Sequence, residues 1–242
     1  MSSSSVSETS EAFLHNVKVA PEIFKIRPDY RALLMVVEGI PPGPSDATSE
    51  KLLQQAEQSA KEALSKQAVI EVPHVAAWRD TYKAFGAKPK KEKNSVESLM
   101  KRAEGGLPRV NRLTDIYNAI SVKHQIPLGG EDLDKYSGDA RLVRATGDEN
   151  FETTASAEPV VEYPPQGEAV WCDEAGVTCR RWNWRQCSRT ALSEGTTRTF
   201  FIMDALKPCS DEALEAAADE LVEVLTSLSP DVRASRRVIR AI

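Results

Sequence analysis

Residues 180–186 concentrate hydrogen-bond donors beside aromatic rings, in the order Arg-Arg-Trp-Asn-Trp-Arg-Gln. If this segment is a strand, its side chains alternate between two faces. Arg181, Asn183 and Arg185 would then share one face, while the two tryptophans pack on the core from the other. Guanidinium and amide groups suit a carboxylate, a phosphate or a carbonyl. The alternative is a ladder of stacked Arg and Trp side chains with surface salt bridges.

A second set of polar residues lies in a predicted helix over residues 111–123. Asn111, Asp115 and Asn118 follow the spacing i, i+4, i+7 and therefore share one face. Asn and Asp are poor helix formers, so another reason for their presence is needed. They either hydrogen-bond the neighbouring loop at residues 127–130 or form the wall of a site. Asp115 is the one group among these candidates that can act as a base.

A third candidate site is the segment at residues 78–93, which combines aromatic and basic side chains. Trp78, Tyr82 and Phe85 form one stripe of a predicted helix, a pattern more typical of core packing than of a base-stacking platform. The loop that follows carries four lysines: Lys88, Lys90, Lys91 and Lys93. These lysines could meet a phosphate backbone, or they simply form a solvated loop.

Common catalytic signatures are absent from the sequence, including Gly-x-Ser-x-Gly, a Gly-rich phosphate loop and His-Glu-x-x-His. The three histidines lie far apart, so we expect no zinc. Glu131, Asp132 and Asp134 could bind a divalent cation, although a polar turn that caps a helix is the preferred interpretation. We therefore predict no metal site.

The composition is that of a globular protein that is not a general nucleic-acid binder. The 242 residues carry a net charge of −5, so a polyanion would have to meet a local basic patch, and we expect no DNA partner. No run is long and apolar enough for a membrane span, and the Ser-rich start lacks the apolar core of a secretory signal. The four cysteines occur singly, as expected for reduced thiols in a cytoplasmic protein.

Helices are predicted mainly in the first half of the chain and strands in the second. Residues 23–40 are predicted to form two strands, interrupted at 27–29. Helices are predicted after a cap at Ser45 or Asp46, from Pro73, after a cap at Asn94 or Ser95, and after Ser210. Strands are predicted at 141–145, in a hairpin over 168–183 and at 196–203. This order predicts an α+β fold with mixed or antiparallel sheets and helices packed on one side. We expect a disordered tail at 1–11, one domain at 12–229 and an Arg-containing tail at 230–242.

Several motifs, in order along the chain, resemble the B3/B4 tRNA-editing domain of the phenylalanyl-tRNA synthetase beta subunit. They are Asn111-Arg-Leu-Thr-Asp115-Ile-Tyr-Asn118, Pro127-Leu-Gly-Gly-Glu-Asp132, Gly167-Glu-Ala-Val-Trp-Cys-Asp173 and Ser193-Glu-Gly-Thr196-Thr197. The motif from Trp78 to Pro89 and the heptad at 180–186 are similar to those of freestanding members of this family.

The resemblance implies the fold of the editing module and a pocket for the aminoacyl end of tRNA. It implies that Asn111, Asn118, Gly129 and Gly130 help to line that pocket, that the acceptor end of tRNA is the partner, and that no cofactor is needed. The family hydrolyses a wrongly attached amino acid, with positioning of the ester and a water supplying much of the rate.

The chain also departs from the synthetase pattern. It has Leu128-Gly129-Gly130 where the synthetase loop has a histidine, and the 180–186 heptad replaces a Gly-rich segment that carries a site glutamate. The leading hypothesis is a trans-editing aminoacyl-tRNA deacylase. The alternatives are a binding module without turnover and a hydrolase of small amino-acid esters or amides.

Overall fold

The most apolar segment of the chain forms the middle of a sheet. In the computed structural model, which describes residues 5–241, β2 (Arg31–Glu38) is buried from Ala32 to Val37. It pairs antiparallel with β10 (Thr199–Ala205) and with β11 (Arg233–Arg240), and β3 (Leu128–Asp132) completes the order β11-β2-β10-β3. Because β2 is buried on both faces, each face of this central sheet needs a covering layer.

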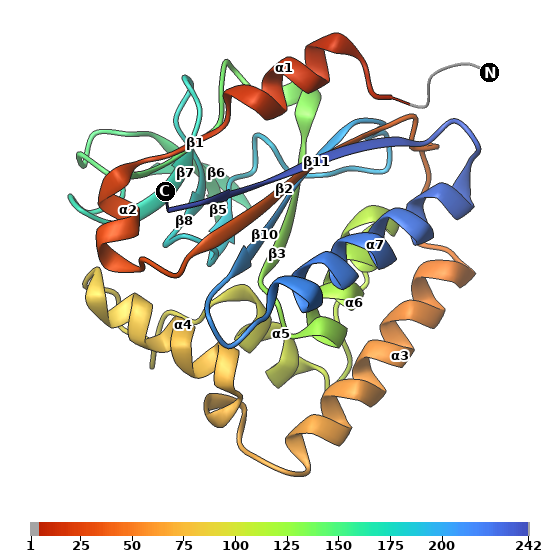
Figure 1. Cartoon of the computed structure of the whole chain (residues 1–242), viewed down its shortest axis with the longest axis horizontal. Helices are drawn as coiled ribbons and strands as arrows, with labels where there is room; N and C mark the ends of the chain where they lie inside the picture. Colours follow the sequence, from red (N-terminus) through yellow and green to blue (C-terminus); the bar gives the residue numbers. More distant parts are fainter. Residues whose placement is uncertain (1–4, 242) are drawn as a thin grey trace.

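Helices cover one face of the central sheet. α6 (Arg112–His124) and α7 (Asp211–Leu228) pack their apolar residues against it, and α3 (Ala47–Leu64) packs on α6. Figure 1 shows these three helices on the same side of the sheet. This layer agrees with the predicted α+β fold.

A second sheet covers the other face. Its strands follow the order β1 (Lys18–Val19), β4 (Arg141–Arg144), β7 (Ala169–Cys172), β8 (Val177–Arg180) and β9 (Arg185–Gln186). The contact between the sheets is closed by α4 (Pro73–Ala84), whose Trp78 lies 5.4 Å, centroid to centroid, from Trp182. Trp78, Tyr82 and Phe85 are buried, which confirms the prediction of a core stripe. Smaller elements outside these sheets include η1 (Val69–Glu71), η2 (Leu133–Lys135) and the hairpin β5–β6 (Phe151–Ala155, Glu158–Glu162).

Capping residues place the helices where the sequence predicts them. Asp46 accepts hydrogen bonds from the N–H groups of Thr48 and Ser49, both at 2.9 Å, at the start of α3. Asn94 caps α5 (Ser95–Arg102) and Ser210 caps α7 in the same way. Such caps satisfy N–H groups that have no partner inside the helix.

The N-terminal predictions are wrong where the structure describes this part of the chain. Residues expected to be a disordered tail enter α1 (Glu8–Asn16), which is anchored because Ser7 and Ser10 donate hydrogen bonds to Glu38 of β2. The tail residues 1–4 lie outside the described part. The strand expected from Ile23 is instead α2 (Pro21–Ile26), which begins with a proline at its first position, where the missing N–H costs nothing.

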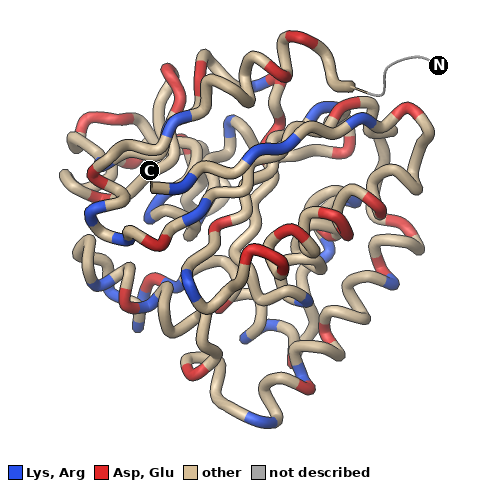
Figure 2. The backbone as a smooth tube through the Cα atoms, in the orientation of Figure 1, with Lys and Arg blue, Asp and Glu red and all other residues tan. Residues whose placement is uncertain are grey.

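The predicted C-terminal tail is an edge strand of the central sheet. β11 pairs with β2 over its whole length, and two of its arginines, Arg236 and Arg240, face acidic residues of α7. Arg236 lies 2.9 Å from Glu215 and 2.6 Å from Asp219. Figure 2 shows the acidic residues that run along α7 beside the basic strand. The strand was not predicted because the acidic residues that pair with its arginines lie on α7, outside the local sequence.

The helix lengths and the cysteine side chains can be compared with the expectations from sequence. The helices described over residues 5–241 include none that is both long and apolar enough to cross a membrane. The four cysteines are free and buried, as predicted for single thiols. The boundaries of the expected domain at 12–229 remain a prediction.

Candidate functional site

A cavity of about 680 Å³ lies between the two sheets. Its walls come from β3 and β10 of the central sheet, from the 180–186 segment, and from α5 and α6. The residues that line it include Ser95, Arg102, Tyr117, Asn118, Gly129, Glu131, Trp171, Cys179, Trp182, Asn183, Arg185, Gln186, Cys187 and Asp204. Its size falls within the usual range for small-molecule sites.

The Arg/Trp heptad is a turn, not the strand that the face argument required. Between β8 and β9 the backbone of Arg181 (φ 48°) and Trp182 (φ 69°) adopts the left-handed conformation. The expected alternation is therefore wrong. Trp182 is fully buried, while Asn183 and Arg185 line the cavity. Two adjacent non-glycine residues in this conformation are unusual and are held by the surrounding packing.

Arg181 does not belong to the cavity lining. Its guanidinium lies 3.3 Å from Glu92 and 3.6 Å from Glu168, and it stacks at 4.0 Å from the ring centroid of Trp184. Burial lowers the pKa of Arg181, although the carboxylate of Glu168 opposes this effect. The ion pairs and the stacking of Arg181 therefore stabilise the turn.

The three polar residues on α6 divide between structure and site. The side chain of Asn111 caps the helix by accepting from the Thr114 N–H at 2.9 Å, and it also donates to the carbonyl of Leu192. Asn118, two turns further, lines the cavity, and its side-chain amide forms no hydrogen bond within residues 5–241.

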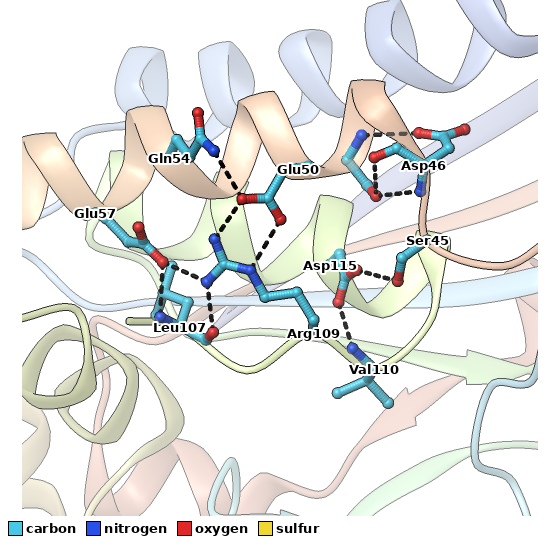
Figure 3. Close-up of polar contacts among 10 residues, drawn as sticks. Ser45, Asp46, Glu50, Gln54, Glu57, Leu107, Arg109, Val110 and Asp115 are labelled. Carbon is cyan, nitrogen blue, oxygen red and sulfur yellow. Dashed lines mark hydrogen bonds and ion pairs between the residues drawn. The ribbon is translucent and has the colours of Figure 1, made fainter. Parts of the chain in front are cut away.

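Asp115 is fully buried but lies outside the cavity lining. One carboxylate oxygen accepts from the hydroxyl of Ser45, and the other accepts from the Val110 N–H at 2.8 Å. Figure 3 shows these contacts beside a second tie, in which Arg109 bridges Glu50 and Glu57. Both oxygens of Asp115 are engaged in joining loops to α6, so its arrangement favours a structural role over that of a base.

The two glycines of β3 point to opposite faces. A Cβ at Gly129 would lie 2.9 Å from Nε2 of Gln186, on the cavity side. A Cβ at Gly130 would lie 2.8 Å from the ring of Phe201, on the helix side. Gly129 thus lets Gln186 approach closely enough to donate to the Gly130 carbonyl at 3.0 Å. Of the two glycines, Gly129 lines the cavity and Gly130 does not.

Asp204 is a lining residue that our site prediction missed. It is 2% exposed, and its oxygens accept from the Tyr30 hydroxyl at 2.6 Å and from the Asn183 amide at 3.2 Å. Burial raises the pKa of Asp204 to about 7. The only sequence signal was a single acid within the apolar run of β10.

Glu131 also lines the cavity, although its sequence neighbourhood indicated only a polar turn or a cation site. It is 1% exposed, and one oxygen accepts from the hydroxyl of Tyr136. Burial raises the pKa of Glu131 to about 7, against the opposing effect of the Tyr136 hydroxyl. Its neighbours Asp132 and Asp134 have protein partners, namely Thr196 and Arg198.

Buried polar atoms without partners gather around this cavity. Over the described range, nine buried side-chain atoms lack a hydrogen-bond partner, and five of them belong to lining residues. These five are Ser95 Oγ, Glu131 Oε1, Trp171 Nε1, Trp182 Nε1 and Arg185 Nε. Because buried polar groups are nearly always paired, the concentration marks a place where a ligand or water completes the hydrogen bonds.

A family model described as the B3/4 domain matches residues 77–229, more than half of the chain and the whole of the cavity lining. The chain belongs to the B3/4 domain family. No curated protein matches it significantly. Among solved structures, it is similar to an N-terminal fragment of the phenylalanyl-tRNA synthetase beta subunit from Pyrococcus horikoshii, with 14% identity and a TM-score of 0.44. That match covers 90% of this chain and 50% of the synthetase fragment.

The lysine loop of this B3/4 domain leads into the cavity wall. Lys88, Lys90 and Lys91 are exposed, and Lys93 is half-buried. None of the four forms an ion pair with another described residue. The loop is attached to the 180–186 turn through Glu92, which contacts Arg181, and it continues into α5, whose Ser95 and Arg102 line the cavity. The unpaired lysines therefore lie close in sequence to the cavity wall.

The B3/4 domain offers no evident metal centre in the part that the structure describes. No group of three or more His, Cys, Asp or Glu side chains there is arranged to hold an ion. The cavity presents hydrogen-bond donors and carboxyl groups in a space walled by tryptophan and aliphatic side chains.

Proposed function

We propose that this protein is a trans-editing aminoacyl-tRNA deacylase, which hydrolyses the ester of a mischarged or non-protein amino acid on tRNA in the cytoplasm. Membership in the B3/4 family suggests a tRNA-related function. The observation that carries the proposal is the cavity with its unpartnered buried polar atoms. Its volume suits an aminoacyl group and a terminal nucleoside rather than a longer polymer.

Two donors of the lining fit the ester. The amide of Asn118 and Nε of Arg185 have no protein partner, and both are available to bind the ester carbonyl. When water attacks that carbonyl, negative charge develops on its oxygen before the bond to the ribose oxygen breaks. Donors placed beforehand stabilise this charge without reorganisation, which is how such sites lower a barrier.

Covalent catalysis by the cavity cysteines is not part of the proposal. Burial raises the pKa of Cys179 well above its ordinary value, and burial also raises the pKa of Cys187. The thiolate, which is the reactive form, is therefore disfavoured in both residues. Direct attack by water on a well-positioned ester remains the simplest route.

The test is hydrolysis of a panel of mischarged tRNAs by the purified protein and by the Asn118→Ala and Arg185→Ala variants. We expect selective deacylation of at least one member, reduced on the order of 100-fold in kcat/KM by each substitution. Arg141→Ala is the matched control, because Arg141 is exposed on β4 and does not line the cavity. Undiminished hydrolysis in both cavity variants would refute the roles of these donors.

The alternative function is a binding module that holds the aminoacyl end of tRNA without turnover. It is favoured by the lack of a reactive nucleophile among the described lining residues. Tight binding of an aminoacyl-tRNA with no release of amino acid, over the whole panel, would select this alternative.

A further inference from the structure

Glu131 lines the cavity and has one carboxyl oxygen without a hydrogen-bond partner within residues 5–241. It lies on β3 two residues after Gly129, so both residues face the same side of the sheet, toward the second sheet. One oxygen accepts from Tyr136, while Oε1 is buried and has no hydrogen-bond partner within residues 5–241. The nearby hydroxyls of Thr178 and Thr190 favour the ionised form, and the Thr178 hydroxyl also lacks a hydrogen-bond partner there. A carboxyl oxygen left in this state loses hydration without compensation, which is costly unless a ligand donates to it.

No described cationic side chain compensates Glu131. It forms no ion pair with Lys, Arg or His, and neither does Asp204, the second buried carboxyl of the cavity. The two arginines of the lining lie nearer to solvent. Arg102 is exposed, and Arg185, whose side chain is 39% exposed, already pairs with Glu162 at 3.1 Å. The cavity therefore has carboxyl groups in its interior and guanidinium groups toward solvent.

This arrangement of charge is complementary to a particular ligand. A buried carboxyl without a counter-ion is satisfied by a cation that brings its own N–H donors. A primary ammonium has three donors and is small enough to enter a cavity. The exposed guanidinium of Arg102 suits the opposite end of the ligand, where a phosphate would lie.

We propose that Oε1 of Glu131 binds a free primary ammonium group of the ligand, so that the cavity accepts aminoacyl compounds with an unblocked amine and rejects their N-acylated forms. This inference rests on the proposed function, because it names the chemistry by which the same cavity selects its aminoacyl group. The ammonium is either the α-amine or a side-chain amine, and the two are separated by the probes below.

The experiment measures binding of non-hydrolysable amides, in which phenylalanine or lysine is linked to 3′-amino-3′-deoxyadenosine. Each probe is made with a free and with an acetylated α-amine. We expect acetylation to weaken binding of the phenylalanyl probe by about 10- to 100-fold, the range for a hydrogen bond to a charged group. Loss for both the phenylalanyl and the lysyl probe would assign the α-ammonium. Retention for the acetylated lysyl probe, together with stronger binding than that of its phenylalanyl counterpart, would assign a side-chain ammonium.

Variants connect this preference to Glu131. Glu131→Gln keeps the shape but removes the charge, and we expect it to bind free and acetylated probes with equal affinity. Glu194→Gln is the matched control, since Glu194 is exposed and forms no ion pair within the described residues, and it should keep the wild-type preference.

Three results would overturn the inference: equal binding of free and acetylated probes by the wild type, an unchanged preference in Glu131→Gln, or no binding of any free-amine probe. Hydrolysis of mischarged tRNA without an ammonium preference would refute this inference alone. An ammonium preference without any deacylation would instead refute the enzymatic function and leave the subsite in place.

Discussion

Glu131 is a carboxylic acid buried without a cationic partner, and burial raises its pKa from 4.5 to about 7. In the unfolded chain it ionises near 4.5. Between these two values only the unfolded state loses the proton, so the free energy of unfolding falls as pH rises through this window. Below about pH 4.5 Glu131 is protonated in both states and does not reduce the free energy of unfolding. Above about pH 8 both are ionised and the loss is complete.

Replacing Glu131 by Gln should therefore stabilise the free protein at high pH. We expect the difference in unfolding free energy between Glu131→Gln and wild type to rise by up to about 3 kcal/mol from pH 4.5 to pH 8.5, from a pKa difference of roughly 2.5 units. Urea denaturation at the two pH values measures it, with Glu194→Gln as the control. A difference that does not change with pH would contradict the perturbed carboxyl.

Single residues of the site were only partly predictable from sequence. Asn118, Gly129, Asn183 and Arg185 line the cavity, and their role in substrate binding stays a prediction. Asn111 instead caps a helix, Asp115 joins two loops to α6, and Arg181 forms ion pairs. Local sequence gives a residue's chemistry, whereas its partners are set by segments far along the chain. Asp204 was missed for this reason, because its two donors come from positions 30 and 183.

At the scale of elements, Asp115 joins two loops to the start of α6. Its carboxylate accepts from Ser45 before α3 and from Val110 before α6. Asp115→Ala would leave both donors without a partner in a buried place. We expect a loss of about 2–4 kcal/mol in unfolding free energy, while kcat/KM of the remaining folded protein stays within a few-fold of wild type.

Ser45→Ala distinguishes between the two hydrogen bonds that Asp115 accepts. It removes one donor and leaves the Val110 bond intact, so we expect a smaller loss of about 1 kcal/mol. Thermal or urea denaturation measures stability, and deacylation is assayed well below the melting transition. If Asp115→Ala kept its stability but lost activity by several orders of magnitude, Asp115 would be the catalytic base after all.

Helix positions followed from sequence because their capping signals are local. Asp46, Asn94 and Ser210 each act on N–H groups within three residues. The turn at residues 181–184 could not be predicted in the same way, since no Gly or Asn stands at its two left-handed positions. There the tertiary packing of Trp182, in edge contact with Tyr30 at 4.8 Å, decides the backbone conformation.

Across the whole molecule, charges of both signs are interspersed, and the net charge is −5. Long-range attraction of a polyanion is therefore not expected, and binding of tRNA has to rely on a local basic surface. The arginines of β11 are already engaged: Arg236 and Arg240 are paired with acids of α7, and Arg233 and Arg237 donate to backbone carbonyls. The lysine loop at residues 88–93 remains, since its four lysines have no ion-pair partner in the described chain.

Reversing two charges in this loop tests its role. We expect Lys90→Glu with Lys91→Glu to weaken tRNA binding at least tenfold at low salt. We also expect the slope of log affinity against log salt to become shallower by about 0.7 for each phosphate that the variant no longer neutralises. Lys61→Glu with Lys66→Glu is the matched control, because these exposed lysines near the end of α3 change the net charge equally.

The Lys90→Glu/Lys91→Glu variant also distinguishes a tRNA substrate from a small amino-acid ester. If the natural substrate is aminoacyl-tRNA, the loop variant should reduce deacylation of tRNA mainly through KM, while binding of the adenosine amide probes stays unchanged. An equal reduction in both double variants would mean that net charge, not the loop, governs binding. If neither variant affects hydrolysis of an aminoacyl ester, and tRNA is not bound at all, the protein acts on small amino-acid esters. The loop would then be a solvated connection between α4 and α5.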